Sequence, residues 1–95
     1  MTGEREVKAV RVRVSGTVQG VGFRYFTRSV AAALGIDGYV RNLSDGSVEA
    51  VAEGESDRVD MFVEKVSKGP PASRVSGVRV SEIAPSGREG FEIRL

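Results

Sequence analysis

The chain has 95 residues, 40% of them hydrophobic and 28% charged, with a formal net charge of +1, which suits one globular domain with a single hydrophobic core. The low net charge disfavours nucleic-acid or membrane binding by bulk electrostatics, no apolar run approaches the roughly 20 residues of a membrane span, and no signal peptide is visible. The absence of cysteine and histidine excludes disulfides, thiolate nucleophiles, zinc–thiolate sites and imidazole as a general base.

The chain is predicted to begin with a loose tail and an alternating strand. Residues 1–6 are small or charged and are expected to form the tail, followed by one domain over residues 7–95. In the first strand Val10, Val12 and Val14 fall on one face, the pattern of a half-buried strand.

Two segments carry apolar residues at helical spacing. The first is predicted over residues 23–34, and the following Gly35 is a common helix-ending residue. The second is expected to use Ser56 as its N-cap, to place Asp57 near the positive end of the helix dipole, and to stop at Gly69 and the two prolines after it.

The remaining segments predict four further strands. The first two are joined by a tight turn whose Asp-Gly pair is a strong hairpin signal, and the strands are expected at residues 36–42, 47–53, 75–83 and 91–95. The element order predicts an α+β, ferredoxin-like fold, a split β-α-β sandwich (βαββαβ plus a short C-terminal strand). Two helices should cover one face of a mostly antiparallel sheet, with the third strand between the first and the second. The aromatic core candidates are Phe23, Phe26, Tyr39 and Phe62.

The connection between the first strand and the first helix predicts an anion site. The segment Val14-Ser-Gly-Thr-Val-Gln-Gly-Val-Gly-Phe-Arg24 is a glycine-rich loop that leads into a helix. Backbone N–H groups of such a loop and of a helix N-terminus bind anions, and the Arg24 guanidinium adds a fork that matches phosphate. A cation in the first helical turn costs about 0.3–1 kcal/mol against the helix dipole, which favours a nearby anion. The sequence therefore predicts a phosphate cradle with its own arginine.

Simpler interpretations stand beside this one. Gly20 and Gly22 could be ordinary turn residues with positive φ, and Arg24 a solvated helix residue. Asn42 taken alone is a strand-end residue that bonds to the turn. The pattern leaves open whether Asn42 faces the cradle, because that depends on strand register and twist.

The cradle segment resembles the first signature of the acylphosphatase family. Gly38-Tyr-Val-Arg-Asn-Leu-Ser-Asp-Gly-Ser-Val48, closing at Gly54, resembles the second, and the segments 69–75 and 91–94 are similar to later family segments. The likeness runs from about Val7 to the C-terminus. It departs from the family pattern at Leu43, where many relatives carry a small hydroxyl residue.

The resemblance implies hydrolysis of an acyl phosphate to a carboxylate and inorganic phosphate. By similarity Arg24 is the phosphate-binding catalytic arginine and Asn42 orients the attacking water. The loop is expected to bind phosphate through backbone N–H donors, so that the binding set is Gln19, Gly20, Val21, Gly22, Phe23 and Arg24. No metal or cofactor is expected. Inorganic phosphate should be product and inhibitor of a cytoplasmic monomer that binds neither nucleic acid nor membrane.

Elementary chemistry agrees with this residue set. A carboxylate leaving group is a weak base and departs without a general acid, whereas an alkoxide would need a proton donor. Phosphoryl transfer spreads charge over the equatorial oxygens, so preorganised donors, one guanidinium and a positioned water are enough. With no thiolate to take the phosphoryl group, direct attack by water is the simple route.

Three alternatives compete with a free-standing acylphosphatase. A non-catalytic phosphate- or acyl-phosphate-binding regulatory domain would need the cradle but no water-orienting asparagine. An RNA-recognition domain shares the element order but stacks bases on aromatic residues of two central strands, which the strands at 7–14 and 47–53 lack. The acylphosphatase-like region of hydrogenase-maturation carbamoyltransferases continues into cysteine-rich zinc segments, whereas this sequence contains no cysteine. A free-standing acylphosphatase is preferred, and the physiological acyl group stays open.

Overall fold

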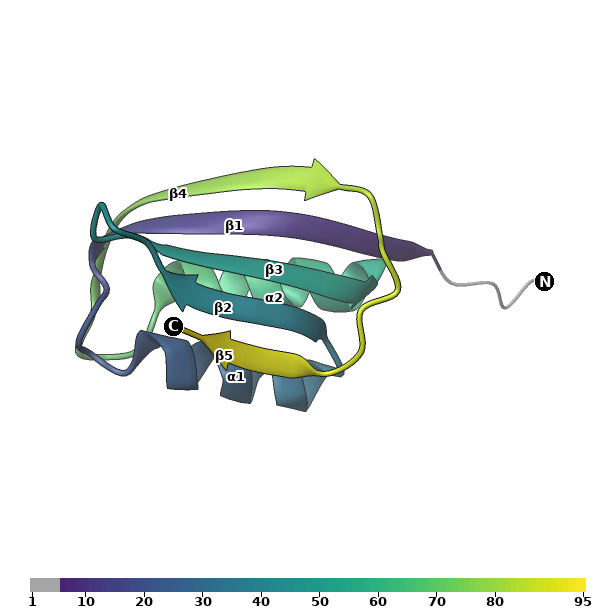
Figure 1. The fold of residues 1–95 in the computed structure, drawn as a ribbon, viewed down its shortest axis with the longest axis horizontal. Helices are drawn as coiled ribbons and strands as arrows, with labels where there is room; N and C mark the ends of the chain where they lie inside the picture. The colour runs from purple at the N-terminus through teal and green to yellow at the C-terminus, as the bar shows by residue number, and fades with distance from the viewer. Residues whose placement is uncertain (1–5) are drawn as a thin grey trace.

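The computed structural model describes residues 6–95, so residues 1–5 of the predicted tail lie outside the described residues. Within this range two helices pack against one face of a five-stranded sheet (Figure 1). In chain order the elements are β1 (Val7–Thr17), α1 (Phe23–Leu34), β2 (Asp37–Asn42), β3 (Val48–Glu55), α2 (Ser56–Lys68), β4 (Arg74–Ile83) and β5 (Phe91–Arg94).

The sheet has the order β4-β1-β3-β2-β5. The neighbours are antiparallel except for β2 and β5, which run parallel. This arrangement confirms the predicted ferredoxin-like fold, including the placement of β3 between β1 and β2. The division into a tail and one domain stays a prediction.

The core lies between the sheet and the two helices. Val10, Val12 and Val14 of β1 are buried on the helix side, as their alternation predicts. Phe23 of α1 and Phe62 of α2 are the largest fully buried side chains, and burial of side chains of this size stabilises a fold by about 1.5–3 kcal/mol each. Both helices are therefore held mainly by their apolar faces.

The end of β1 is shaped by a glycine. The pairing of β1 with β4 shifts register between Ser15 and Gly16, a β-bulge, and then continues to Thr17. Gly16 has φ 128°, and a Cβ there would collide with the carbonyl oxygen of Arg74. The strand is thus three residues longer than the predicted range, and it delivers the chain directly to the loop before α1.

Two sequence predictions are wrong in detail. β3 stays paired with β1 as far as Val7 opposite Glu55, so Glu55 is the N-cap of α2 and Ser56 is its first helical residue. Tyr39 is not a core residue, because Gly38 and Val40 take the buried face of β2 and alternation turns Tyr39 to the other face. There the Arg94 guanidinium lies 3.9 Å from the centroid of its ring. Asp57 does lie in the first turn of α2, as predicted.

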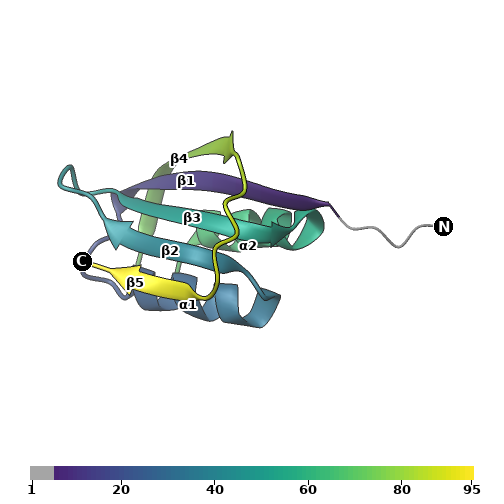
Figure 2. The same ribbon diagram turned by 45° about the vertical axis from the view of Figure 1, so that its right-hand side comes forward.

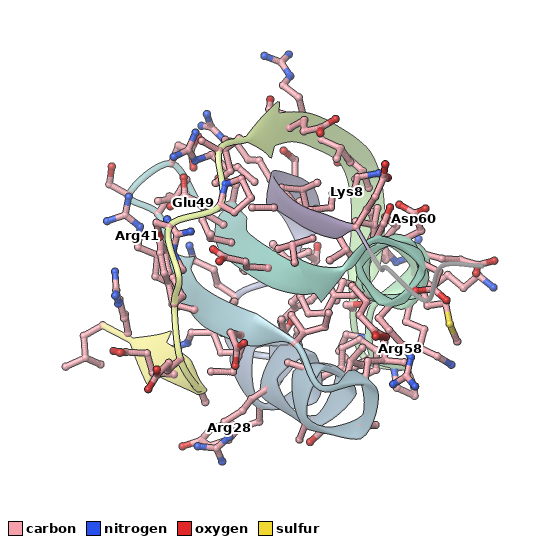
Figure 3. All side chains as sticks on the ribbon, turned by 90° about the vertical axis from the view of Figure 1, so that its right-hand side faces the viewer. Lys8, Arg28, Arg41, Glu49, Arg58 and Asp60 are labelled. Carbon is pink, nitrogen blue, oxygen red and sulfur yellow. The ribbon has the colours of Figure 1, made fainter. Side chains whose placement is uncertain are left out.

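The sheet face away from the helices carries opposite charges side by side. Glu49 of β3 lies between Arg11 and Arg41, with Oε2 3.4 Å from Arg11 Nε and Oε1 2.8 Å from Arg41 Nε. Figure 3 shows Arg41 and Glu49 together on this face. A separate ion pair, between Lys8 and Asp60, lies beside α2. The arginines on these strands are therefore partly neutralised within the chain.

Glu53 of β3 anchors the connection between β4 and β5, which crosses in front of the sheet (Figure 2). Its Oε1 accepts hydrogen bonds from the Ser86 N–H at 3.0 Å and from Arg88 Nη1 at 2.8 Å, and its Oε2 accepts one from the Gly87 N–H at 2.8 Å. Donation by the Ser86 N–H is the largest of the effects that hold the pKa of Glu53 below its usual value. This carboxylate fixes the segment that leads into β5.

Replacing Glu53 with alanine should lower the free energy of unfolding by about 1.5–3 kcal/mol, because hydrogen bonds to a charged group contribute about that much. Urea unfolding of Glu53→Ala beside the wild type measures the loss. Glu89→Ala is the matched control, since Glu89 is an exposed carboxylate of the same connection, and its effect should stay within about 0.5 kcal/mol. Equal losses in the two variants would contradict the anchoring role of Glu53.

Candidate active site

The predicted cradle is the loop between β1 and α1. Val18 is fully buried and anchors the loop, whereas Gly20 and Gly22 have φ of 76° and 77°, a conformation that favours glycine. Gly22 is also the N-cap of α1, and it offers no side chain to the helix N-terminus. The helical bonds begin with the Phe26 N–H donating to the Gly22 carbonyl oxygen at 3.0 Å. The N–H groups that precede it have no acceptor within the helix, as at every helix start.

Arg24 lies in the first turn of α1, at the position predicted. Its side chain is half-buried, and Nη1 donates a hydrogen bond to the Arg94 carbonyl oxygen of β5 at 3.2 Å. Within α1, which the structure describes in full, the first turn contains no acidic residue. The contact with β5 orients the guanidinium and was not predicted, because no local pattern reports a contact across 70 residues of sequence.

Asn42 faces the cradle, which settles the question that the sequence left open. It is the last residue of β2 and pairs with Val48, and alternation puts it on the same side as the buried Val40. A pocket of about 220 Å³ opens there, lined by Val18, Gly20, Gly22, Phe23, Arg24, Tyr25 and Asn42. The fold therefore brings Arg24 and Asn42 to one pocket at the end of the sheet where β1 and β2 finish.

Not every predicted binding residue lines this pocket. Gly20, Gly22, Phe23 and Arg24 do, whereas Gln19 and Val21 are not among the lining residues. Val21 packs against the hydrophobic core instead. The predicted donation by the backbone N–H groups of these loop residues stays a prediction.

One residue of the site, Tyr25, and the side-chain contacts of another, Gln19, were missed by the sequence interpretation. Tyr25 lines the pocket with its side chain 64% exposed, and the Arg28 guanidinium lies 5.4 Å from its ring centroid. The Gln19 side chain reaches the turn after β2, where Nε2 donates to the carbonyl oxygens of Leu43 at 2.8 Å and Ser47 at 2.9 Å. Adjacency to Arg24 could have suggested Tyr25, but nothing in the sequence pattern indicates the Gln19 contacts.

The turn after Asn42 is closed by its own polar contacts. The Leu43 N–H donates to the Ser47 carbonyl oxygen at 2.8 Å. Asp45 accepts hydrogen bonds from the Ser47 hydroxyl and N–H and pairs with the Arg13 guanidinium. These contacts, led by the Ser47 hydroxyl, lower the pKa of Asp45 from 3.8 to about 2. They confirm that Asp45 serves the turn.

Acid should weaken this turn in a defined pH window. A carboxyl whose pKa is lower in the folded state stabilises the fold fully above its unfolded pKa, and the contribution disappears as pH falls through the folded pKa. The contribution of Asp45 should therefore be complete above pH 3.8 and be lost towards pH 2. Unfolding free energies of wild type and Asp45→Asn measured from pH 5 to pH 1.5 should converge across this window. A difference that is unchanged at the lowest pH would refute the assignment.

Among residues 6–95, no group of three or more histidine, cysteine, aspartate or glutamate side chains is placed to hold a metal ion. No helix within the same range is long and apolar enough to cross a membrane.

The fold and the pocket together define a small α+β domain with a glycine-rich loop and a pocket at one end of its sheet. A model of the acylphosphatase family matches residues 10–93, and the chain belongs to that family. The acylphosphatase of Rubrobacter xylanophilus is 55% identical over 95 residues, covering 99% of this chain and 86% of that protein. The acylphosphatase of Thermotoga petrophila is 53% identical over 88 residues, covering 93% of this chain and 98% of that protein. The crystal structure of acylphosphatase from Bacillus subtilis superposes with a TM-score of 0.90 at 40% identity, covering 95% of this chain and all of that one.

Proposed function

We propose that this acylphosphatase hydrolyses acyl phosphates by holding the phosphoryl group in the loop of residues 19–24 and attacking phosphorus directly with water. The observation that carries the proposal is the pocket that Arg24 and Asn42 share with Gly20 and Gly22. Neither the family match nor the site favours the non-catalytic binding domain that the sequence left open.

The cradle and Arg24 bind and stabilise the phosphoryl group. The backbone N–H groups of the loop and of the first turn of α1 donate to the phosphoryl oxygens, and the guanidinium neutralises their charge. Negative charge spreads over the equatorial oxygens in the transition state, so donors fixed in advance lower the barrier without reorganising. Arg24 thus binds substrate and stabilises the transition state.

Asn42 orients the nucleophile. Within residues 6–95 its carboxamide makes no hydrogen bond to another protein group, so Oδ1 is available to accept one from a water molecule. The water oxygen bonds to phosphorus as the bond from phosphorus to the acyl oxygen breaks, and the products are a carboxylate and inorganic phosphate. The carboxylate leaves without protonation, and the protons of the water stay with the phosphate.

The proposal extends to the partners of the site. Inorganic phosphate, the product, should compete with substrate because it fits the same cradle. No metal takes part, no nucleic acid is bound, and the chain works as a monomer. A cytoplasmic location belongs to the same proposal and rests on the sequence alone.

The test is hydrolysis of benzoyl phosphate by the purified chain in excess EDTA, beside glycerol 3-phosphate as an alkyl phosphate. We expect the chain to hydrolyse benzoyl phosphate at the same rate with and without EDTA. We expect no hydrolysis of glycerol 3-phosphate, because its alkoxide would have to leave without a proton. No turnover by a chain shown to be folded would favour a regulatory phosphate-binding domain. Turnover that stops in EDTA would overturn the metal-free chemistry.

A further inference from the structure

We propose that the side chain of Gln19 is a positioning residue, which fixes the Asn42 end of β2 against the phosphate cradle. The inference rests on the proposed function, since it concerns the water that Asn42 orients. It assigns to Gln19 a role that differs from backbone donation to phosphate, because the carboxamide points to the turn and not to the pocket.

The Gln19 side chain donates two hydrogen bonds to the turn after Asn42. Nε2 carries two N–H donors, and both are used, one on the Leu43 carbonyl oxygen at 2.8 Å and one on the Ser47 carbonyl oxygen at 2.9 Å. Two carbonyl acceptors fix which end of the carboxamide faces the turn, because the amide oxygen cannot donate. One loop side chain thus holds both ends of the turn that follows Asn42.

Gln19 supplies the direct hydrogen bonds between the loop before α1 and the turn after Asn42. Within residues 6–95, these two bonds are the hydrogen bonds that join residues 18–22 to residues 42–47. They end on backbone carbonyls, so they do not need a hydroxyl side chain at position 43, where this chain has leucine. Gln19 therefore joins the loop directly to the turn after Asn42, beside the indirect link from Arg24 through Arg94 of β5 to β2.

Gln19→Met removes this connection cleanly. Methionine has a similar length but no N–H donor, and the backbone N–H of residue 19 stays in the cradle. Both carbonyl oxygens keep another donor, since the Gly46 N–H bonds to Leu43 at 3.2 Å and the Leu43 N–H bonds to Ser47 at 2.8 Å. The variant should fold, because no buried acceptor loses its last partner.

The expected result is a split between turnover and phosphate binding. A misplacement of about 1 Å can cost about 10²-fold in rate, so kcat of Gln19→Met for benzoyl phosphate should fall about 10- to 100-fold. The inhibition constant of inorganic phosphate should change by less than about twofold, since the cradle keeps its donors and Arg24. Asp45→Ala, which loosens the same turn from the other side, is the matched control and should retain kcat within about threefold.

Three outcomes would overturn the proposal. A wild-type kcat in Gln19→Met would show that the bonds do not position Asn42. A parallel loss of phosphate affinity would make Gln19 part of the cradle. An equal loss in Asp45→Ala would mean that any loosening of the turn suffices.

A second measurement separates failure of this inference from failure of the proposed function. The side-chain ¹⁵N–H signals of Asn42 should shift or broaden in Gln19→Met and stay unchanged in Asp45→Ala, whether or not the chain turns over substrate. An Asn42 signal that is identical in wild type and Gln19→Met would refute the positioning role. An inactive wild type with the expected shift would refute only the hydrolysis.

Discussion

Arg24→Ala is expected to lower kcat/KM for benzoyl phosphate by at least ~10²–10³-fold, about 2.7–4 kcal/mol, the usual effect of losing one oxyanion donor. The loss should reach or exceed this range because the guanidinium both binds the phosphoryl group and stabilises its charge in the transition state. Inhibition by inorganic phosphate should weaken in the same variant. Steady-state kinetics with and without phosphate measure both effects.

Two controls make the Arg24 result specific. Arg79→Ala removes an equal charge from an exposed position on β4 and should leave kcat/KM within about twofold. Arg24→Lys keeps the charge but loses the fork that matches phosphate, so it should recover only part of the activity. The fold should be kept, because the side-chain hydrogen bond of Arg24 is a single contact to Arg94 at 3.2 Å. Near-wild-type turnover in a folded Arg24→Ala would remove Arg24 from the mechanism.

Asn42→Ala should lower kcat by about 10²-fold or more, which amounts to loss of hydrolysis. The inhibition constant of inorganic phosphate should stay within about twofold of the wild-type value. The reason is that the carboxamide positions water and does not hold the phosphoryl group, and loss of positioning alone has effects of this size. Kinetics at saturating benzoyl phosphate give kcat, and a series of phosphate concentrations gives the inhibition constant.

Asn42→Asp provides the contrast. It keeps the size of the side chain and an acceptor for water, but it places a negative charge in the pocket that binds a dianion. Phosphate inhibition should therefore weaken in Asn42→Asp and stay unchanged in Asn42→Ala. If Asn42→Ala retains nearly full turnover, the water-orienting role is wrong.

The fold could be predicted from local periodicity. Alternation identified the buried valines of β1, helical spacing identified α1 and α2, and Gly35 and Gly69 mark both helix ends. The errors arose where pairing with another strand overrides local preference. Glu55 stays extended because β1 continues opposite it, and Tyr39 faces outward because Gly38 and Val40 occupy the core side of β2.

The site could be predicted only in part, for the same physical reason. A glycine loop that opens a helix with an arginine is a local signal, so the cradle and Arg24 were visible in the sequence. The orientation of Asn42 depends on the register of β2 with β3, and the contact of Arg24 with Arg94 depends on where β5 ends. The bonds of Gln19 to a turn that lies 24 and 28 residues away have no local signal at all.

In the proposed mechanism water attacks phosphorus beside Arg24, and the position of an oxygen label distinguishes this attack from attack on the carbonyl carbon. Benzoyl phosphate is hydrolysed by the purified chain in H₂¹⁸O with EDTA, and benzoate and phosphate are analysed by mass spectrometry. We expect one ¹⁸O in each inorganic phosphate formed by the enzyme and none in benzoate. Label in benzoate would show attack at the carbonyl carbon and would overturn direct attack on phosphorus.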